Sequence, residues 1–103
     1  MEPEKAELRE AIHLLRQGDL EAAHDIVQRY ESGAGAYLHG VVHRMEGDVS
    51  NALYWFRRAA ELADAVGTDP VDLTHRAAAA PVPDDMLKTD FEKELTAVLA
   101  YLD

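Results

Sequence analysis

The amino-acid sequence predicts an all-α protein made of two helical hairpins, a short helix and a long C-terminal helix. Apolar residues recur at three- and four-residue steps, which is the period of one face of a helix. In the Gly-Asp pairs at 18–19 and 47–48, the glycine is favourable at the end of one helix and the aspartate at the start of the next. Runs of β-branched residues and Asn-Gly or Gly-Gly hairpin turns are missing from the sequence. A chain of 103 residues has the length of one domain, so we expect a single helical domain over 1–103.

The first hairpin is expected over residues 4–32. Its first helix is indicated by an apolar face at Leu8, Ala11, Ile12 and Leu15. Gly18 suits the left-handed position that ends a helix, and Asp19 is a favourable N-cap for the next helix. That second helix should run to about Tyr30, and the segment 32–35 should then break it.

The second hairpin is expected over residues 33–66, with helices at about 36–45 and 48–65. Gly47 and Asp48 repeat the helix-ending glycine and the N-cap aspartate of the first hairpin, and Gly67 ends the fourth helix. The consecutive aromatic residues Tyr54, Trp55 and Phe56 point about 100° apart on a helix. One hairpin partner cannot bury all three, so a second apolar surface is required.

The C-terminal segment 69–103 is expected to cap the hairpins. Asp69 is an N-cap, Pro70 suits a first helical turn, and the short helix that follows should end in the alanines at 77–80. A last helix of about 19 residues should begin at 83–85, since the apolar residues after that point keep a helical period. Its stripe is the expected second surface for the three aromatic residues and consists of Leu87, Phe91, Leu95, Val98, Leu99 and Leu102.

The two Gly-Asp turns belong to an internal repeat with an offset of 29 residues. Segment 17–30 aligns with 46–59. In the second hairpin Ala52, Phe56 and Ala59 form a small-large-small series, and Gly40 is a small residue on the preceding helix. Over about residues 4–65 the chain resembles the tetratricopeptide superfamily, including its Sel1-type repeats. The resemblance implies a right-handed α-α superhelix that holds a peptide on its concave face. It would place there Tyr37, Val41, Arg44 and Met45, with Leu8, Ile12 and Arg16 from the first hairpin. The alternative is that the C-terminal helix covers these residues, because most of them are apolar.

The sequence also departs from the tetratricopeptide pattern. Its offset is shorter than the usual repeat of about 34 residues, and His39 and His43 stand where the family has a large aliphatic and an aromatic residue. Two repeats are visible, whereas repeat proteins normally need about three or more for stability. The last helix is therefore expected to supply the missing cover.

His39 and His43 are four residues apart on one helix face, and His24 lies on the neighbouring helix. This spacing can bind a metal ion, and three imidazoles could converge. The favoured interpretation is structural: partly buried rings hydrogen-bonded within the hairpins, to Asp48, Asn51 or a tyrosine hydroxyl. No glutamate follows His39, so the zinc-protease pattern is absent. We therefore expect no metal and no cofactor, and a His24, His39 and His43 metal site stays open as the alternative.

The charged and polar residues of the second hairpin allow two interpretations. For Arg44, Arg57 and Arg58, surface ion pairing worth ~0–1 kcal/mol each is favoured. The alternative is a basic spot for a partner carboxylate or phosphate, because guanidinium groups match both. Asn51 lies three residues after Asp48 and is expected to help cap the helix.

Composition excludes several classes of function. A formal net charge of −10, from 20 acidic and 10 basic residues, disfavours binding to nucleic acid and to anionic membranes. No apolar run approaches the ~20 residues of a membrane-spanning helix. The absence of cysteine excludes disulfides, thiolate metal sites and cysteine nucleophiles. The N-terminal stretch is acidic, unlike a signal peptide, so a cytoplasmic location is expected.

The sequence thus predicts a small, non-enzymatic module that binds a protein, a peptide or a second copy of itself. No Ser-His-Asp order, carboxylate-pair motif or phosphate-binding loop is present. The alternative is a small-molecule or metal-binding protein that uses the three histidines. The residues expected to contact a partner are Tyr37, His39, Val41, His43, Arg44, Asn51 and Arg57.

Overall fold

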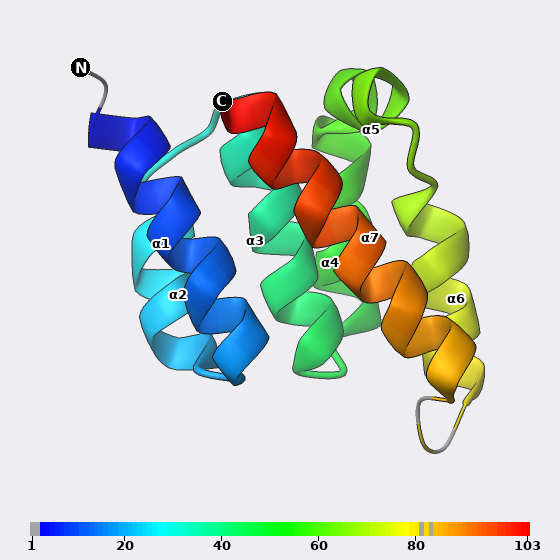
Figure 1. The fold of residues 1–103 in the computed structure, drawn as a ribbon. Helices are drawn as coiled ribbons and strands as arrows, with labels where there is room; N and C mark the ends of the chain where they lie inside the picture. Colours follow the sequence, from blue (N-terminus) through cyan, green and yellow to red (C-terminus); the bar gives the residue numbers. More distant parts are fainter. Residues whose placement is uncertain (1–2, 81, 83) are drawn as a thin grey trace.

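The computed structural model describes residues 3–80, 82 and 84–103, and these residues form seven helices and no strand. The prediction of an all-α fold is confirmed. Two antiparallel hairpins come first in the chain, and three further helices follow (Figure 1). The helices are α1 (Pro3–Gln17), α2 (Leu20–Val27), α3 (Gly33–Met45), α4 (Val49–Arg58), α5 (Ala60–Val66), α6 (Pro70–Ala79) and α7 (Asp85–Leu102).

The two Gly-Asp turns have the same backbone geometry, as the internal repeat predicts. Gly18 and Gly47 have φ angles of 79° and 81°, in the left-handed region that favours glycine. The side chain of Asp19 accepts a hydrogen bond from the N–H of Ala22, and that of Asp48 accepts one from the N–H of Asn51. Each turn therefore ends one helix and caps the next within two residues.

The break between the second and third helices lies at residues 28–32, earlier than the predicted 32–35. Ser32 is the N-cap of α3, and its hydroxyl accepts a hydrogen bond from the N–H of Gly35 at 3.2 Å. The glycines form the first turn of the helix, because the chain passes too close there for a side chain. A Cβ at position 35 would lie 2.4 Å from the carbonyl oxygen of Tyr30.

Two helix boundaries also differ from the predictions. The second helix ends at Val27, before the predicted end at Tyr30, and the residues after it form a turn. The predicted helix over 48–65 is divided in two at Ala59, whose φ and ψ of −104° and 18° are not helical. The change of direction at this buried alanine brings Leu62 onto the start of α3, where a Cβ at Gly33 would lie 3.3 Å from the Cβ of Leu62. Tertiary packing of α5 therefore overrides the local helical pattern.

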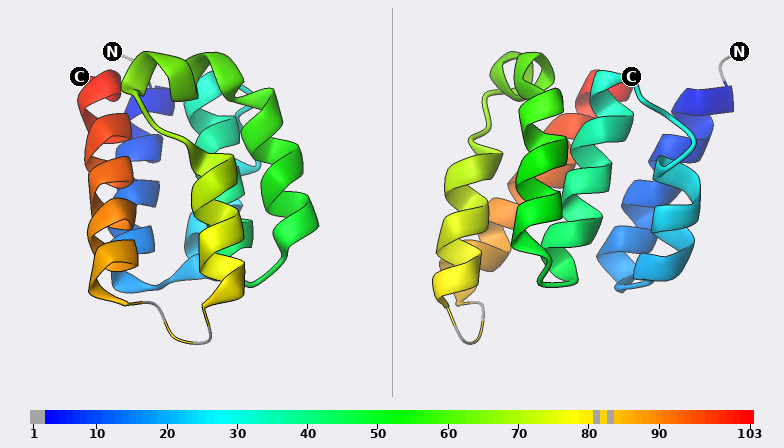
Figure 2. Two further views of the ribbon diagram at one scale, coloured as in Figure 1. Left: turned by 90° about the vertical axis from the view of Figure 1, so that its right-hand side faces the viewer. Right: turned by 180° about the vertical axis from the view of Figure 1, so that it is seen from behind.

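Helix α7 is part of the core, and it lies on one side of the hairpins. It packs against α1, α5 and α6, while α2 and α4 lie on the opposite side of α3 (Figures 1 and 2). Four of its predicted stripe residues are buried: Leu87, Leu95, Val98 and Leu102.

The expectation that α7 would cover the three consecutive aromatic residues is wrong for two of them. Phe56 is buried at the α3–α4 interface, where its ring meets that of Tyr37 with a centroid distance of 5.2 Å. Trp55 stacks on His39, on the side of α3 away from α7, and Tyr54 is 51% exposed. Helix α7 instead covers the face of α3 on which the tetratricopeptide resemblance places a ligand.

Candidate functional site

Helix α3 carries the candidate residues on two opposite faces. Tyr37, Val41 and Arg44 follow one another at steps of four and three residues, and they face α7. His39 and His43 lie on the other side, where both rings contact that of His24 on α2 and His39 stacks on Trp55 of α4. The structure therefore does not bring the predicted set together as one site, and the two groups must be considered separately.

A buried ion pair joins α3 to α7. Glu94 is 2% exposed, and its carboxylate accepts hydrogen bonds from both terminal nitrogens of Arg44, one of them at 3.2 Å. The hydroxyl of Tyr37 also donates to this carboxylate and lies 2.9 Å from the hydroxyl of Thr68. Burial and the neighbouring carboxylate of Glu94 raise the pKa of Tyr37 well above its ordinary value, so its proton stays in place. The expectation that Arg44 pairs at the surface is wrong, because α7 encloses it.

The guanidinium group of Arg44 is also held by aromatic rings. Its central carbon lies 5.2 Å from the ring centroid of Phe56 and 4.8 Å from that of Phe91. Cation–π contacts of this kind favour a desolvated arginine. Arg44 therefore links the hairpin core to the C-terminal helix by charge and by packing.

A pocket remains open beside this ion pair, at the end of α3 and the first half of α7. Its volume is about 720 Å³, within the usual range for ligand pockets of roughly 300–1,000 Å³. Most of its lining is apolar, and its charged lining residues are Arg16, Arg44, Lys88, Glu92 and Glu94. Arg16 pairs with Glu92 at 2.6 Å, whereas Lys88 makes no ion pair within the part of the chain that the structure describes.

Three histidines converge on the opposite face of α3. One ring nitrogen from each of His24, His39 and His43 lies within 4.8 Å of the other two. The Nε2 atoms of His24 and His39 are 3.2 Å apart, and the rings of His39 and His43 stack with centroids 4.9 Å apart. The spacing of four residues on α3 and the packing of α2 against that helix together produce this cluster, as the sequence predicts for its three members.

His39 is the buried member of the cluster. It is 6% exposed, and burial is the main cause that lowers its pKa to about 4, with further contributions from His24 and His43. The ring of Trp55 lies parallel to it, with an angle of 11° and centroids 4.0 Å apart. The Nδ1 atom of His39 is buried and has no hydrogen-bond partner among the described residues. The predicted hydrogen bonds to Asp48, Asn51 or a tyrosine hydroxyl therefore do not form at this ring.

The last two candidate residues, Asn51 and Arg57, lie outside both groups. Asn51 donates a hydrogen bond from its side-chain nitrogen to the carboxylate of Asp48 at 2.7 Å, so it contacts the residue that caps α4, and its side chain does not itself bond a backbone group among the described residues. The same contact is the main cause that lowers the pKa of Asp48. Arg57 is exposed, and it makes no ion pair with any residue whose position is described.

Sequence reasoning missed Glu94 and Glu46. Glu94 lies three residues after Phe91 and four before Val98, inside the apolar stripe, and an acidic residue at such a position is a signal of a buried partner. Glu46 follows His43 by three residues, and its Oε1 lies 3.0 Å from Nδ1 of that ring. This contact would have been predictable, since side chains three residues apart are neighbours on a helix.

Comparisons of the chain with protein-family models, with curated proteins and with solved structures gave no match. Across the described residues, no helix has the length and apolar character needed to cross a membrane.

Proposed function

We propose that this chain is a small, non-enzymatic interaction module that binds a segment of a partner protein. The observation that carries the proposal is the open pocket beside Arg44. The tetratricopeptide resemblance implies a ligand on the face of α3 that holds Tyr37, Val41 and Arg44. Helix α7 covers Tyr37, and the uncovered end of that face is this pocket.

The lining of the pocket favours a segment with an apolar side chain next to a carboxylate. Val41, Leu15 and Leu95 supply apolar walls, and Met45 is 45% exposed at the opening. Methionine adapts its shape readily to different apolar groups. Lys88 offers a cation at the same edge, in a chain whose net charge is −10, so an acidic group has a local partner there.

The proposal is tested by affinity capture from a lysate of the source cells with three forms of the protein. Met45→Glu places a charge in the opening of the pocket. Tyr101→Glu is the matched control, because Tyr101 is also exposed, at 56%, and lies near the far end of α7 from the pocket. The expected result is a protein that the wild type and the control retain and that Met45→Glu loses. Amine-directed cross-linking should join that protein to Lys88.

Two results would contradict the proposal. One is equal retention of the same proteins by Met45→Glu and the wild type. The other is a wild-type dimer in light scattering that Met45→Glu converts to a monomer, since the pocket would then bind a second copy of this chain.

A further inference from the structure

We propose that His24, His39 and His43 form a binding site for a divalent transition-metal ion, with Zn²⁺ as its occupant. The site lies across α3 from the pocket, and it depends on none of the residues that line the pocket. The proposed metal site and the proposed interaction module can therefore be tested independently of each other.

The distance between two of the donors already matches a metal shell. Zinc binds histidine nitrogen at about 2.0–2.1 Å, so two nitrogens in a tetrahedral shell lie about 3.3 Å apart. The Nε2 atoms of His24 and His39 are 3.2 Å apart. One ring nitrogen of His43 lies within 4.8 Å of a ring nitrogen of each of the other two histidines, so it would have to move closer to complete the shell.

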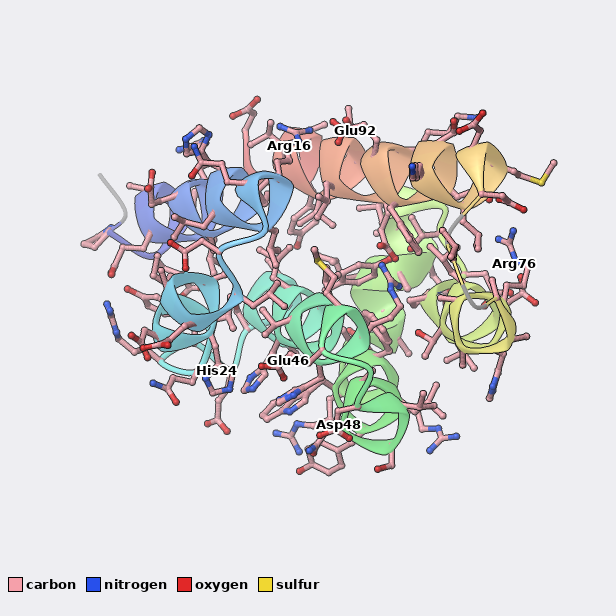
Figure 3. The ribbon with its side chains drawn as sticks, turned by 90° about the horizontal axis from the view of Figure 1, so that it is seen from below. Arg16, His24, Glu46, Asp48, Arg76 and Glu92 are labelled. Carbon is pink, nitrogen blue, oxygen red and sulfur yellow. The ribbon has the colours of Figure 1, made fainter. Side chains whose placement is uncertain are left out.

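A carboxylate stands where it would orient one ligand. Oε1 of Glu46 lies 3.0 Å from Nδ1 of His43, so Nδ1–H donates to the carboxylate and the lone pair of Nε2 is free. Metal-binding histidines commonly have this arrangement, because the hydrogen bond sets the tautomer and makes the ligating nitrogen more basic. In Figure 3 Glu46 and His24 lie on the same side of the molecule, away from α7.

The ring plane of His39 is fixed by an aromatic neighbour. The ring of Trp55 lies parallel to it, at an angle of 11° and with centroids 4.0 Å apart. The Nε2 atom of His39 lies 3.2 Å from Nε2 of His24, so Nε2 is the nitrogen that would bind the ion.

The donor set indicates the class of ion. Three imidazoles without a thiolate suit Zn²⁺, Cu²⁺, Ni²⁺ and Co²⁺, whereas Mg²⁺ and Ca²⁺ prefer oxygen ligands. Three protein ligands leave a fourth position for water or for a group from another molecule. The net charge of −10 also raises the local concentration of cations.

The test compares zinc binding by two double variants of the full chain. His24→Gln with His43→Gln removes the two half-buried ligands and keeps His39. His13→Gln with His75→Gln is the matched control, because these histidines are exposed and lie outside the cluster, and both variants have the same composition. Equilibrium dialysis with zinc chloride, in excess Mg²⁺, should give one zinc per chain for the wild type and the control. The cluster variant should bind at least about tenfold more weakly, since the loss of two ligands exceeds the 10–100-fold effect of a second-shell change.

A second readout needs no variant. Trp55 is the only tryptophan, and it stacks on His39, so Co²⁺ or Ni²⁺ in the site should quench its fluorescence until one equivalent is bound. A chelator should restore the emission. Saturating zinc should also raise the Tm of the wild type by about 10 °C or more, because the ion binds only the folded state. Equal zinc binding by the cluster variant and the wild type, or the absence of any saturable quenching, would overturn the proposal.

Discussion

Replacing Glu94 by glutamine should destabilise the protein more than any change of a surface charge. The substitution keeps the shape of the side chain and removes its charge, so Arg44 is left in the core without a counter-ion. The side chains of Arg44 and Glu94 are 4% and 2% exposed, and water therefore cannot replace the lost carboxylate. Removing one partner of a buried ion pair typically costs about 3–5 kcal/mol.

The geometry of the pair supports a value in that range. One of its two hydrogen bonds, from Nη1 of Arg44 to Oε2 of Glu94, measures 3.2 Å, which places the charge centres about 4 Å apart. At an effective dielectric constant of about 20, two such charges attract by about 4 kcal/mol. Tyr37 adds a third hydrogen bond to the carboxylate, which glutamine accepts less strongly.

Urea and thermal unfolding, followed by circular dichroism, measure this effect. Glu94→Gln should lower the free energy of unfolding by about 3–5 kcal/mol and the Tm by more than about 10 °C. The double variant Arg44→Met, Glu94→Leu should recover stability to within about 1 kcal/mol of the wild type, because well-packed apolar residues can replace a buried pair. A cost below about 1 kcal/mol for Glu94→Gln would refute the reasoning, since it would mean that the pair is solvated and does not fasten α7.

Three further perturbations test the hairpin interface, the C-terminal helix and the buried histidine. Gly40→Ala should lower the stability of the second hairpin by about 1–3 kcal/mol in urea unfolding, because the new Cβ would lie 2.7 Å from the ring of Phe56; Phe56→Leu should partly rescue it, and an unchanged stability would contradict this packing. Removal of residues 84–103 should abolish cooperative melting, since burial of each large apolar side chain of α7 contributes about 1.5–3 kcal/mol, and a wild-type melting curve would show that the helix is dispensable. The lowered pKa of His39, about 4 against 6.5, predicts that the unfolded state binds more protons below pH 6.5. Stability should fall by up to about 3 kcal/mol between pH 6.5 and pH 4, and His39→Gln should remove much of that dependence in unfolding curves measured across this range.

Local chemistry determined most of the helical architecture, and this part was predictable from the sequence. Gly18 and Gly47 end helices because glycine accepts positive φ, and the aspartate after each one caps the next helix with its own carboxylate. These effects act over three or four residues. The pairing of the hairpins followed from them, since a tight turn forces consecutive helices to pack side by side.

The candidate sites also have one part that was predictable from the sequence and one part that was not. The separation of His39 and His43 by about one helical turn was predictable, and His24 was predicted on the second helix, which was expected to pack beside the third. The contact of His43 with Glu46 is also local, because three residues separate them on the helix.

Only the tertiary structure decided which side of α3 each polar residue faces and what covers it. Helix α7 could have packed over Trp55, as the exposed aromatic face suggested, or on the face that holds Arg44. It packs on the second face, where Glu94 meets Arg44 across 50 positions of the chain. A helical period indicates that one face of a helix is apolar, but it does not indicate which element packs on that face. That element depends on the direction in which the chain returns after α6. The same choice of side leaves the histidine cluster on the side of α3 away from α7, among α2, α3 and α4.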